Sequence, residues 1–267
     1  MIKDLVEQEF EIIGSPRGFT RNKILFLRRK GELFTYKQFY HESFFNRERE
    51  TYDIIEGLNL INLPERYSVG DDFILYGFLP SSEKVQAKQR LKDWSRVHNS
   101  TRSFDIKSQL VRDPLLIKGR LNRILRNLEN FPGKYGSRAE NYLKTLREGY
   151  STIINPAEVC LVHNDLRGVN TIQQDNKAFY FDFEFSGVGH PFQDLVPAIL
   201  ENPEERDEYI NAYLRNSPML HTAINDLAPW VIFRACDVIG KMGGREIPLK
   251  RKEKIKQKLI RAMNHYC

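Results

Sequence analysis

The chain has 267 residues, of which 41% are hydrophobic and 28% are charged, and it carries a formal net charge of +6. This length suits one large domain or two lobes. The composition argues against a disordered or fibrous protein. The positive net charge suits anionic ligands such as nucleotides. Without a signal-peptide pattern, an apolar stretch of about 18 residues or closely spaced cysteines, we expect a cytoplasmic protein that does not span a membrane.

The first 79 residues are predicted to form an antiparallel sheet with one helix. Short runs rich in Ile, Leu, Phe and Tyr predict strands over residues 11–13, 23–28, 32–39 and 73–78. Between the third and fourth runs, residues 43–58 repeat apolar side chains near the helical spacing, and Gly57 offers a stop. We therefore expect an N-terminal domain over residues 1–79.

Residues 80–267 are predicted to form a larger, mainly helical domain. Apolar periodicity predicts helices over residues 84–99, 114–130, 138–154, 203–214, 224–240 and 251–264. Two β-type runs, at residues 158–162 and 178–183, interrupt the helices and enclose a stretch that carries His, Asp, Arg and Asn. Several titratable groups between two apolar strands indicate a chemical site rather than a simple turn.

The enclosed stretch places His163, Asp165 and Asn170 in the pattern H-x-D-x4-N, and an Asp-Phe-Glu sequence begins at Asp182. Phosphoryl transfer needs a carboxylate beside the attacking hydroxyl and hard oxygen ligands for Mg²⁺. The same spacing occurs in the catalytic loop and metal-binding aspartate of protein kinases. We therefore expect Asp165 to act as the catalytic base and Asn170 and Asp182 to bind Mg²⁺. The alternative is a polar hairpin in which these side chains only bond turn backbone.

These motifs resemble those of the aminoglycoside phosphotransferase and choline kinase superfamily. HNDL at residues 163–166, followed by DFEFSG at residues 182–187, looks most like the choline and ethanolamine kinase branch. The resemblance implies an α+β, bilobal protein-kinase-like fold, with a small N-terminal antiparallel sheet lobe and a larger, mainly helical C-terminal lobe. It also implies ATP or GTP as co-substrate, Mg²⁺ as cofactor and a small-molecule hydroxyl as acceptor. Nucleic acid is not expected as a partner.

The resemblance further implies a nucleotide site in the N-terminal lobe, with a strand lysine paired to a helix glutamate. Lys37 and Glu50 are the preferred candidates and Glu48 is a rival; alternatively, these are surface charges. Residues 14–18 lie where a loop would cover the phosphates. Three residues lie where the hinge between the lobes would contact adenine: Gly77, Phe78 and Leu79.

Two residues near the central motifs have more than one interpretation. The resemblance suggests Glu184 as a second metal ligand. Glu184 lies two positions after Asp182, so the two side chains share a face if both residues belong to a strand. Glu184 could instead meet a cationic substrate or form a salt bridge. Arg167 lies where many protein kinases carry a lysine that faces the γ-phosphate, although it could simply pair with a neighbouring carboxylate. His163, His190 and Asp194 are expected to support the loop.

Three functions are consistent with these residues: a small-molecule kinase, a kinase acting on protein or RNA-associated targets, and an inactive nucleotide-binding scaffold. D-F-E in place of D-F-G, with no A-P-E segment, argues against a protein kinase. Retention of Lys37, Asp165, Asn170 and Asp182 argues against a scaffold. We therefore expect a small-molecule kinase whose acceptor is an amino alcohol such as choline or ethanolamine, an aminoglycoside or a sugar-like compound.

Overall fold

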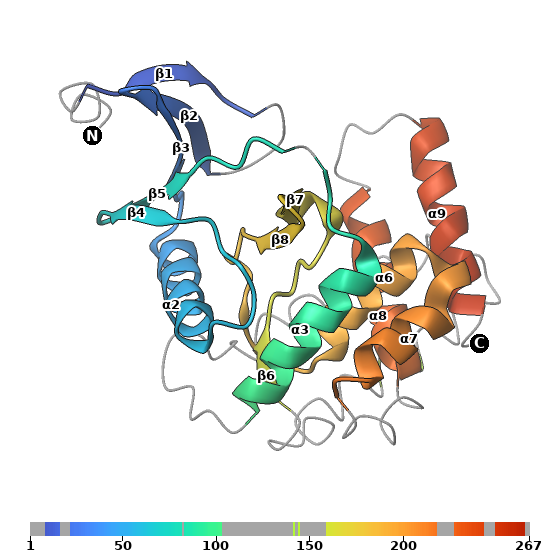
Figure 1. Ribbon diagram of the computed structural model, residues 1–267. Coiled ribbons are helices and arrows are strands. Elements are labelled where there is room, and N and C mark those ends of the chain that lie inside the picture. Colours follow the sequence, from blue (N-terminus) through green and yellow to red (C-terminus); the bar gives the residue numbers. More distant parts are fainter. Residues whose placement is uncertain are drawn as a thin grey trace. The chain divides into compact units, whose positions relative to one another are not determined.

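The computed structural model forms two compact units (Figure 1). The first comprises Met1–Gln86 and Gly168–Ser186, and the second comprises Ala87–Arg167 and Gly187–Cys267. The structure describes residues 9–16, 22–81, 83–102, 141, 144, 159–217, 227–242 and 249–264. The sheet in the first unit and the helices in the second confirm the α+β class expected from the sequence. The domain boundary expected at residue 79 stays a prediction.

A five-stranded antiparallel sheet forms the larger part of the first unit, in the order β1-β2-β3-β5-β4. The strands are β1 Glu11–Gly14, β2 Lys23–Arg29, β3 Glu32–Gln38, β4 Arg66–Val69 and β5 Phe73–Gly77. Lys30 and Gly31 join β2 to β3 with φ values of 50° and 86°, the left-handed conformations that a two-residue hairpin turn requires. This tight turn fixes the register in which Lys37 lies opposite Ile24.

The two faces of this sheet carry different side chains because successive strand residues point in opposite directions. Phe34 and Tyr36 join a buried apolar cluster with neighbours from other strands. Lys37, the next residue of β3, therefore points to the other face. There its ammonium group contacts Glu48 of α2 Glu42–Leu58, a helix that also buries Phe45 on one of its sides.

A second hairpin completes the first unit. A short 3-10 helix, η3 Gly168–Asn170, leads into β7 Thr171–Gln174 and β8 Lys177–Tyr180. The hairpin is held to the earlier part of the unit by two backbone hydrogen bonds, from Tyr180 N to Asn62 O at 3.1 Å and from Gln173 N to Glu83 O at 2.8 Å. The loop that follows β8, residues 181–186, therefore belongs to the same unit as Lys37.

The second unit is mainly helical. Its elements are α3 Ala87–Thr101, β6 Cys160–Val162, β9 Gly187–Gly189, α6 Phe192–Glu201, η4 Pro203–Glu205, α7 Arg206–Leu214, α8 Leu227–Met242 and α9 Leu249–Asn264. Helix α3 packs against α7, and α6 packs against α8 (Figure 1). The short strands β6 and β9 pair antiparallel. These two strands flank the stretch of chain that contains the catalytic motifs.

Most elements that the structure describes were predicted within a few residues. The exceptions are the short strands β4, β7 and β9, the 3-10 helix η3 and the helix α6, which were not predicted. The helices expected over residues 114–130 and 138–154 lie outside the described residues, apart from residues 141 and 144, which are helical. Among the described helices, none is both long and apolar enough to cross a bilayer.

Candidate active site

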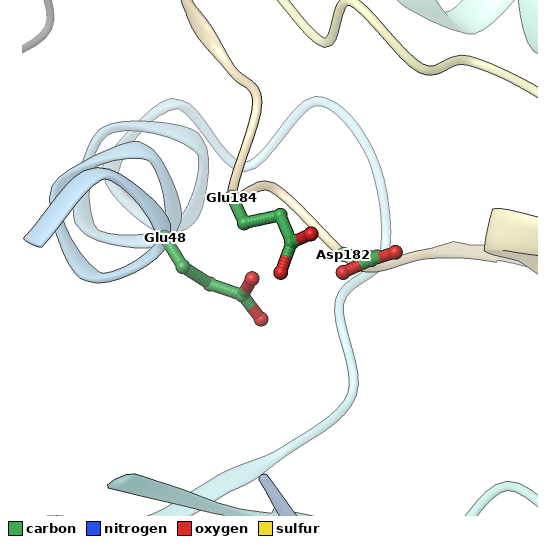
Figure 2. A group of neighbouring side chains, drawn as sticks. All are labelled: Glu48, Asp182 and Glu184. Atoms are coloured by element: carbon green, nitrogen blue, oxygen red, sulfur yellow. The ribbon is translucent and has the colours of Figure 1, made fainter. Parts of the chain in front are cut away.

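Lys37 is surrounded by three carboxylates of the first unit. Its Nζ lies 2.5 Å from Asp182 Oδ1, 2.6 Å from Glu48 Oε2 and 3.6 Å from Glu184 Oε2. These groups come from β3, from α2 and from the loop after β8, and Figure 2 shows the three acidic side chains converging. The sheet, the helix and the hairpin therefore meet at one charged cluster.

Burial and hydrogen bonding give the Lys37–Glu48 pair a fixed geometry. Both side chains are almost fully buried, and the hydroxyl of Tyr76 donates to the second carboxylate oxygen of Glu48 at 2.8 Å. Burial opposes the charge on Lys37, but Asp182, Glu48 and Glu184 outweigh it and raise the pKa of the ammonium group. Burial raises the pKa of Glu48, while Lys37 counteracts part of this increase. Lys37 is thus a charged ammonium group held in one position.

Glu50, the preferred partner of Lys37, was wrong: the rival candidate Glu48 forms the ion pair. Each helical residue advances about 100° around the axis, so residues two apart point in very different directions. The register of α2 against the sheet places Glu48 on the buried side with Phe45 and Tyr52. Glu50 is partly buried elsewhere on the helix.

Asp182 and Glu184 meet in a turn rather than along a strand. Strand β8 ends at Tyr180, and Asp182 has a φ of 68°, a left-handed conformation that Asp adopts more readily than most residues. The same-face argument from strand alternation was therefore wrong, although the two carboxylates do lie together. Asn22 Nδ2 donates to Glu184, and burial, opposed by Lys37 and reinforced by Asp182, raises the pKa of Glu184 to about 7.

The first unit contains a set of oxygen donors that suits Mg²⁺. Glu48, Asp182 and Glu184 each offer an oxygen, and these atoms lie within 4.8 Å of one another. Asn170 is joined to the same loop, since Phe181 N donates to its carbonyl oxygen at 3.3 Å. Carboxylate and amide oxygens are the hard ligands that Mg²⁺ prefers. Because Lys37 and Tyr76 occupy both oxygens of Glu48, the carboxylates better suited to a metal are Asp182 and Glu184.

Asp165 lies in the second unit, where two arginines contact its carboxylate. Arg167 Nη2 lies 2.5 Å from Oδ2, and Arg234 Nη2 of α8 lies 3.4 Å from Oδ1. Burial acts to raise the pKa of Asp165, but Arg167, Arg234 and His163 together lower it below its ordinary value. The group is therefore an ionised acceptor of hydrogen bonds near neutral pH. Arg234 was not singled out in the sequence, since nothing local connects it to Asp165.

A buried network holds the backbone just before Asp165. The carboxylate of Asp194 on α6 accepts hydrogen bonds from the backbone N–H groups of His163 and Asn164, both at 2.7 Å. His98 Nε2 lies 3.0 Å from the same carboxylate, and His98 Nδ1 lies 2.5 Å from the hydroxyl of Tyr213. The supporting role expected for Asp194 is thus confirmed. The parts that His98 and Tyr213 play were not predicted, because they arise from packing between helices.

His190 supports the start of α6. Its Nδ1 accepts a hydrogen bond from the backbone N–H of Phe192 at 3.3 Å, and its ring stacks on Trp230 with centroids 5.2 Å apart. Burial, with contributions from His98 and Arg102, lowers the pKa of His190 to about 3. The imidazole is therefore neutral at physiological pH, which suits a structural role.

The other described residues of the predicted nucleotide site belong to the first unit. Gly77 N donates to Glu65 O at 2.7 Å, and Phe78 N donates to Leu33 O at 3.2 Å. The contacts expected between adenine and Gly77, Phe78 or Leu79 stay a prediction. Of the loop expected at residues 14–18, residues 17 and 18 lie outside the described part of the chain.

Part of the chain is similar to a known protein family, and the whole chain is similar in fold to several solved structures. Residues 112–223 match the family described as "Phosphotransferase enzyme family", while no curated protein sequence matches the chain significantly. An amicoumacin kinase in complex with AMP-PNP, Ca²⁺ and Ami is 14% identical, with a TM-score of 0.69 over 98% of this chain and 93% of that chain.

Two further solved structures show the same likeness. Choline kinase from Streptococcus pneumoniae is 15% identical, with a TM-score of 0.66 over 99% of this chain and 98% of that one. An AMP-bound spectinomycin phosphotransferase is 13% identical, with a TM-score of 0.68 over 98% of each chain. The chain has the protein-kinase-like fold of these enzymes.

Proposed function

We propose that this chain transfers the γ-phosphate of ATP or GTP to a hydroxyl group of a small molecule, such as an amino alcohol, an aminoglycoside or a sugar-like compound. The observation that supports this most is the buried cluster of Lys37, Glu48 and Asp182. A lysine held by a helix glutamate beside a metal-binding aspartate is the arrangement that kinases use to hold nucleotide phosphates. AMP-PNP and AMP in two of the neighbours agree with a nucleotide co-substrate.

In this proposal the first unit holds the nucleotide. Lys37 donates to the phosphates, and its position is maintained by Glu48. Asp182 and Glu184, with Asn170, would hold Mg²⁺, which when bound neutralises phosphate charge. Lys37 also keeps the neighbouring carboxylates close together by offsetting their mutual repulsion.

Asp165 receives the acceptor. Its carboxylate accepts a hydrogen bond from the hydroxyl and takes the proton as the oxygen attacks the γ-phosphorus. The bond from the γ-phosphorus to the β–γ bridging oxygen breaks, and ADP or GDP leaves. The arginines lower the pKa of Asp165, so it is a weak base, and its main contribution is to orient the hydroxyl. Arg167 is about half exposed, and its guanidinium can stabilise charge on the transferred phosphoryl group.

The test is a phosphate-transfer assay with radiolabelled ATP or GTP against amino alcohols, aminoglycosides, sugars and bulk protein. We expect label on a small hydroxyl compound, and we expect Asp165→Asn to reduce turnover by at least about 1,000-fold while nucleotide binding is retained. Asp175→Asn, in an exposed turn, is the matched control and should behave like the unaltered protein. Label found only on protein would favour a protein kinase, and no transfer or hydrolysis with either nucleotide would favour an inactive scaffold.

A further inference from the structure

Asp165 and Arg234 belong to a chain of alternating charges inside the second unit. Arg167 contacts one oxygen of Asp165 at 2.5 Å, and Arg234 contacts the other at 3.4 Å. Arg234 also lies 3.4 Å, through its Nη1, from Asp237 on the next turn of α8. The order is therefore Arg167, Asp165, Arg234 and Asp237, two cations and two anions.

Burial distinguishes Arg234 from an ordinary surface arginine. Its side chain is 18% exposed and that of Asp237 is fully buried, whereas the side chain of Arg167 is 49% exposed. Arginine is almost never so buried without partners, because its charge loses hydration. Asp237 thus holds the guanidinium plane toward Asp165. A guanidinium has five N–H donors, so its contacts with these two carboxylates, counted over the described residues, leave donors that a ligand can use.

The proposed reaction places the acceptor next to this guanidinium. Both oxygens of Asp165 contact an arginine, so an entering hydroxyl must share or displace one of these contacts. The 3.4 Å contact with Arg234 is the longer and weaker one, so the hydroxyl enters more easily on that side. The substituents of the acceptor then lie close to Arg234.

The net charge of these four side chains also becomes more positive during the proposed transfer. The four side chains carry no net charge while Asp165 is ionised, and one net positive charge once Asp165 has taken the proton from the hydroxyl. A negative group on the acceptor is attracted to this developing charge, whereas an ammonium group is repelled by it. Among the acceptors of the proposed function, this charge arrangement therefore favours a sugar-like compound with an anionic substituent over an amino alcohol or an aminoglycoside.

We infer that the acceptor is a hydroxyl compound bearing a phosphate or carboxylate group, and that Arg234 binds this anionic group and so determines specificity. The inference rests on the proposed function, because it assigns the acceptor of the same reaction. Arg234 offers the planar pair of donors that matches either anion. Asp237 is the residue that positions it.

The experiment compares acceptors that share a scaffold and differ in charge. One set is glycerol 3-phosphate, glycerate, glycerol and ethanolamine, and the other is glucose 6-phosphate, gluconate, glucose and glucosamine. We expect an anionic member to have a kcat/KM at least about tenfold above its neutral and cationic counterparts. The anionic compound with the higher kcat/KM then shows whether the site prefers a phosphate or a carboxylate.

Variants then assign this preference to Arg234. Arg234→Gln should lower the ratio of kcat/KM for the anionic acceptor to kcat/KM for its neutral counterpart at least about tenfold, because only the anionic acceptor loses a charged partner. Arg234→Lys keeps the charge and should recover part of the preference, which also controls for folding. Arg215→Gln, an exposed arginine of the same unit, is the matched control and should keep the preference. With AMP-PNP bound, the anionic acceptor should raise the melting temperature of the unaltered protein but not of Arg234→Gln.

Different results would overturn different statements. A cationic member that is phosphorylated better than its anionic counterpart would overturn the inference while supporting the proposed kinase. The same holds if Arg234→Gln lowers activity equally with all acceptors, because Arg234 would then only position Asp165. If no compound is phosphorylated and Asp165→Asn changes nothing, the proposed function itself fails and this inference fails with it.

Discussion

Lys37 donates a hydrogen bond of 2.5 Å to Asp182, a residue 145 positions later in the chain. The contact joins the strand β3 to the loop after β8 inside one compact unit. It also brings an ammonium group between carboxylates that would otherwise repel one another. Nucleotide and metal binding in the proposed reaction therefore depend on how three separate segments of the first unit pack.

The choice of helix glutamate can be tested with two similar substitutions. Glu48→Gln removes the buried charge that holds Lys37, so we expect kcat/KM for the nucleotide to fall about 100-fold. Glu50→Gln, two positions away on the same helix, should cause a much smaller loss. Steady-state kinetics of both purified variants measures the difference. A greater loss in Glu50→Gln would contradict the partner seen in the structure.

Metal dependence should depend on Asp182. We expect EDTA to abolish turnover and added Mg²⁺ to restore it. Asp182→Asn keeps the size of the side chain but removes a charged ligand, so the Mg²⁺ concentration for half-maximal activity should rise at least about tenfold. Titration of activity with Mg²⁺ measures this, with Asp175→Asn as control. Full activity in EDTA would show that the oxygen cluster does not serve a metal.

Asp194 should contribute strongly to stability. Asparagine there offers one oxygen in place of two and points an N–H₂ group at a backbone donor, so we expect Asp194→Asn to lower the free energy of unfolding by about 3 kcal/mol. Asp207→Asn, on the exposed surface of α7, should change it by less than about 0.5 kcal/mol. Urea denaturation of both variants measures the effect. Equal stability would mean that the loop backbone does not need this carboxylate.

His190 predicts a pH dependence of stability. Because burial lowers its pKa from the ordinary 6.5 to about 3, the unfolded chain binds one more proton than the folded chain between these values. The contribution is therefore present above pH 6.5 and is lost as the pH falls toward 3, at up to about 1.4 kcal/mol per pH unit. When the free energy of unfolding is measured with urea between pH 7 and pH 4.5, it should change less steeply with pH in His190→Gln than in the unaltered protein. Parallel profiles would exclude a buried neutral imidazole.

Local features of the chain could be predicted because their signals lie within a few residues. The strands β2, β3 and β5 and the helix α2 show apolar periodicities that reflect which side chains face a core. Helix α6 was not predicted because it lacks such a periodicity. Eight of its ten residues are buried and Pro197 lies inside it, so it shows neither a polar face nor a typical helix composition.

The amino-acid sequence by itself determined the α+β class, the polar segment that contains Asp165 and Asp182 and the kind of chemistry to expect there. These depend on the order and spacing of neighbouring residues. Only the tertiary structure decided that Glu48 and not Glu50 holds Lys37, and that Arg234, 69 residues from Asp165, contacts its carboxylate. Such contacts depend on helix register and packing, which local sequence patterns do not specify.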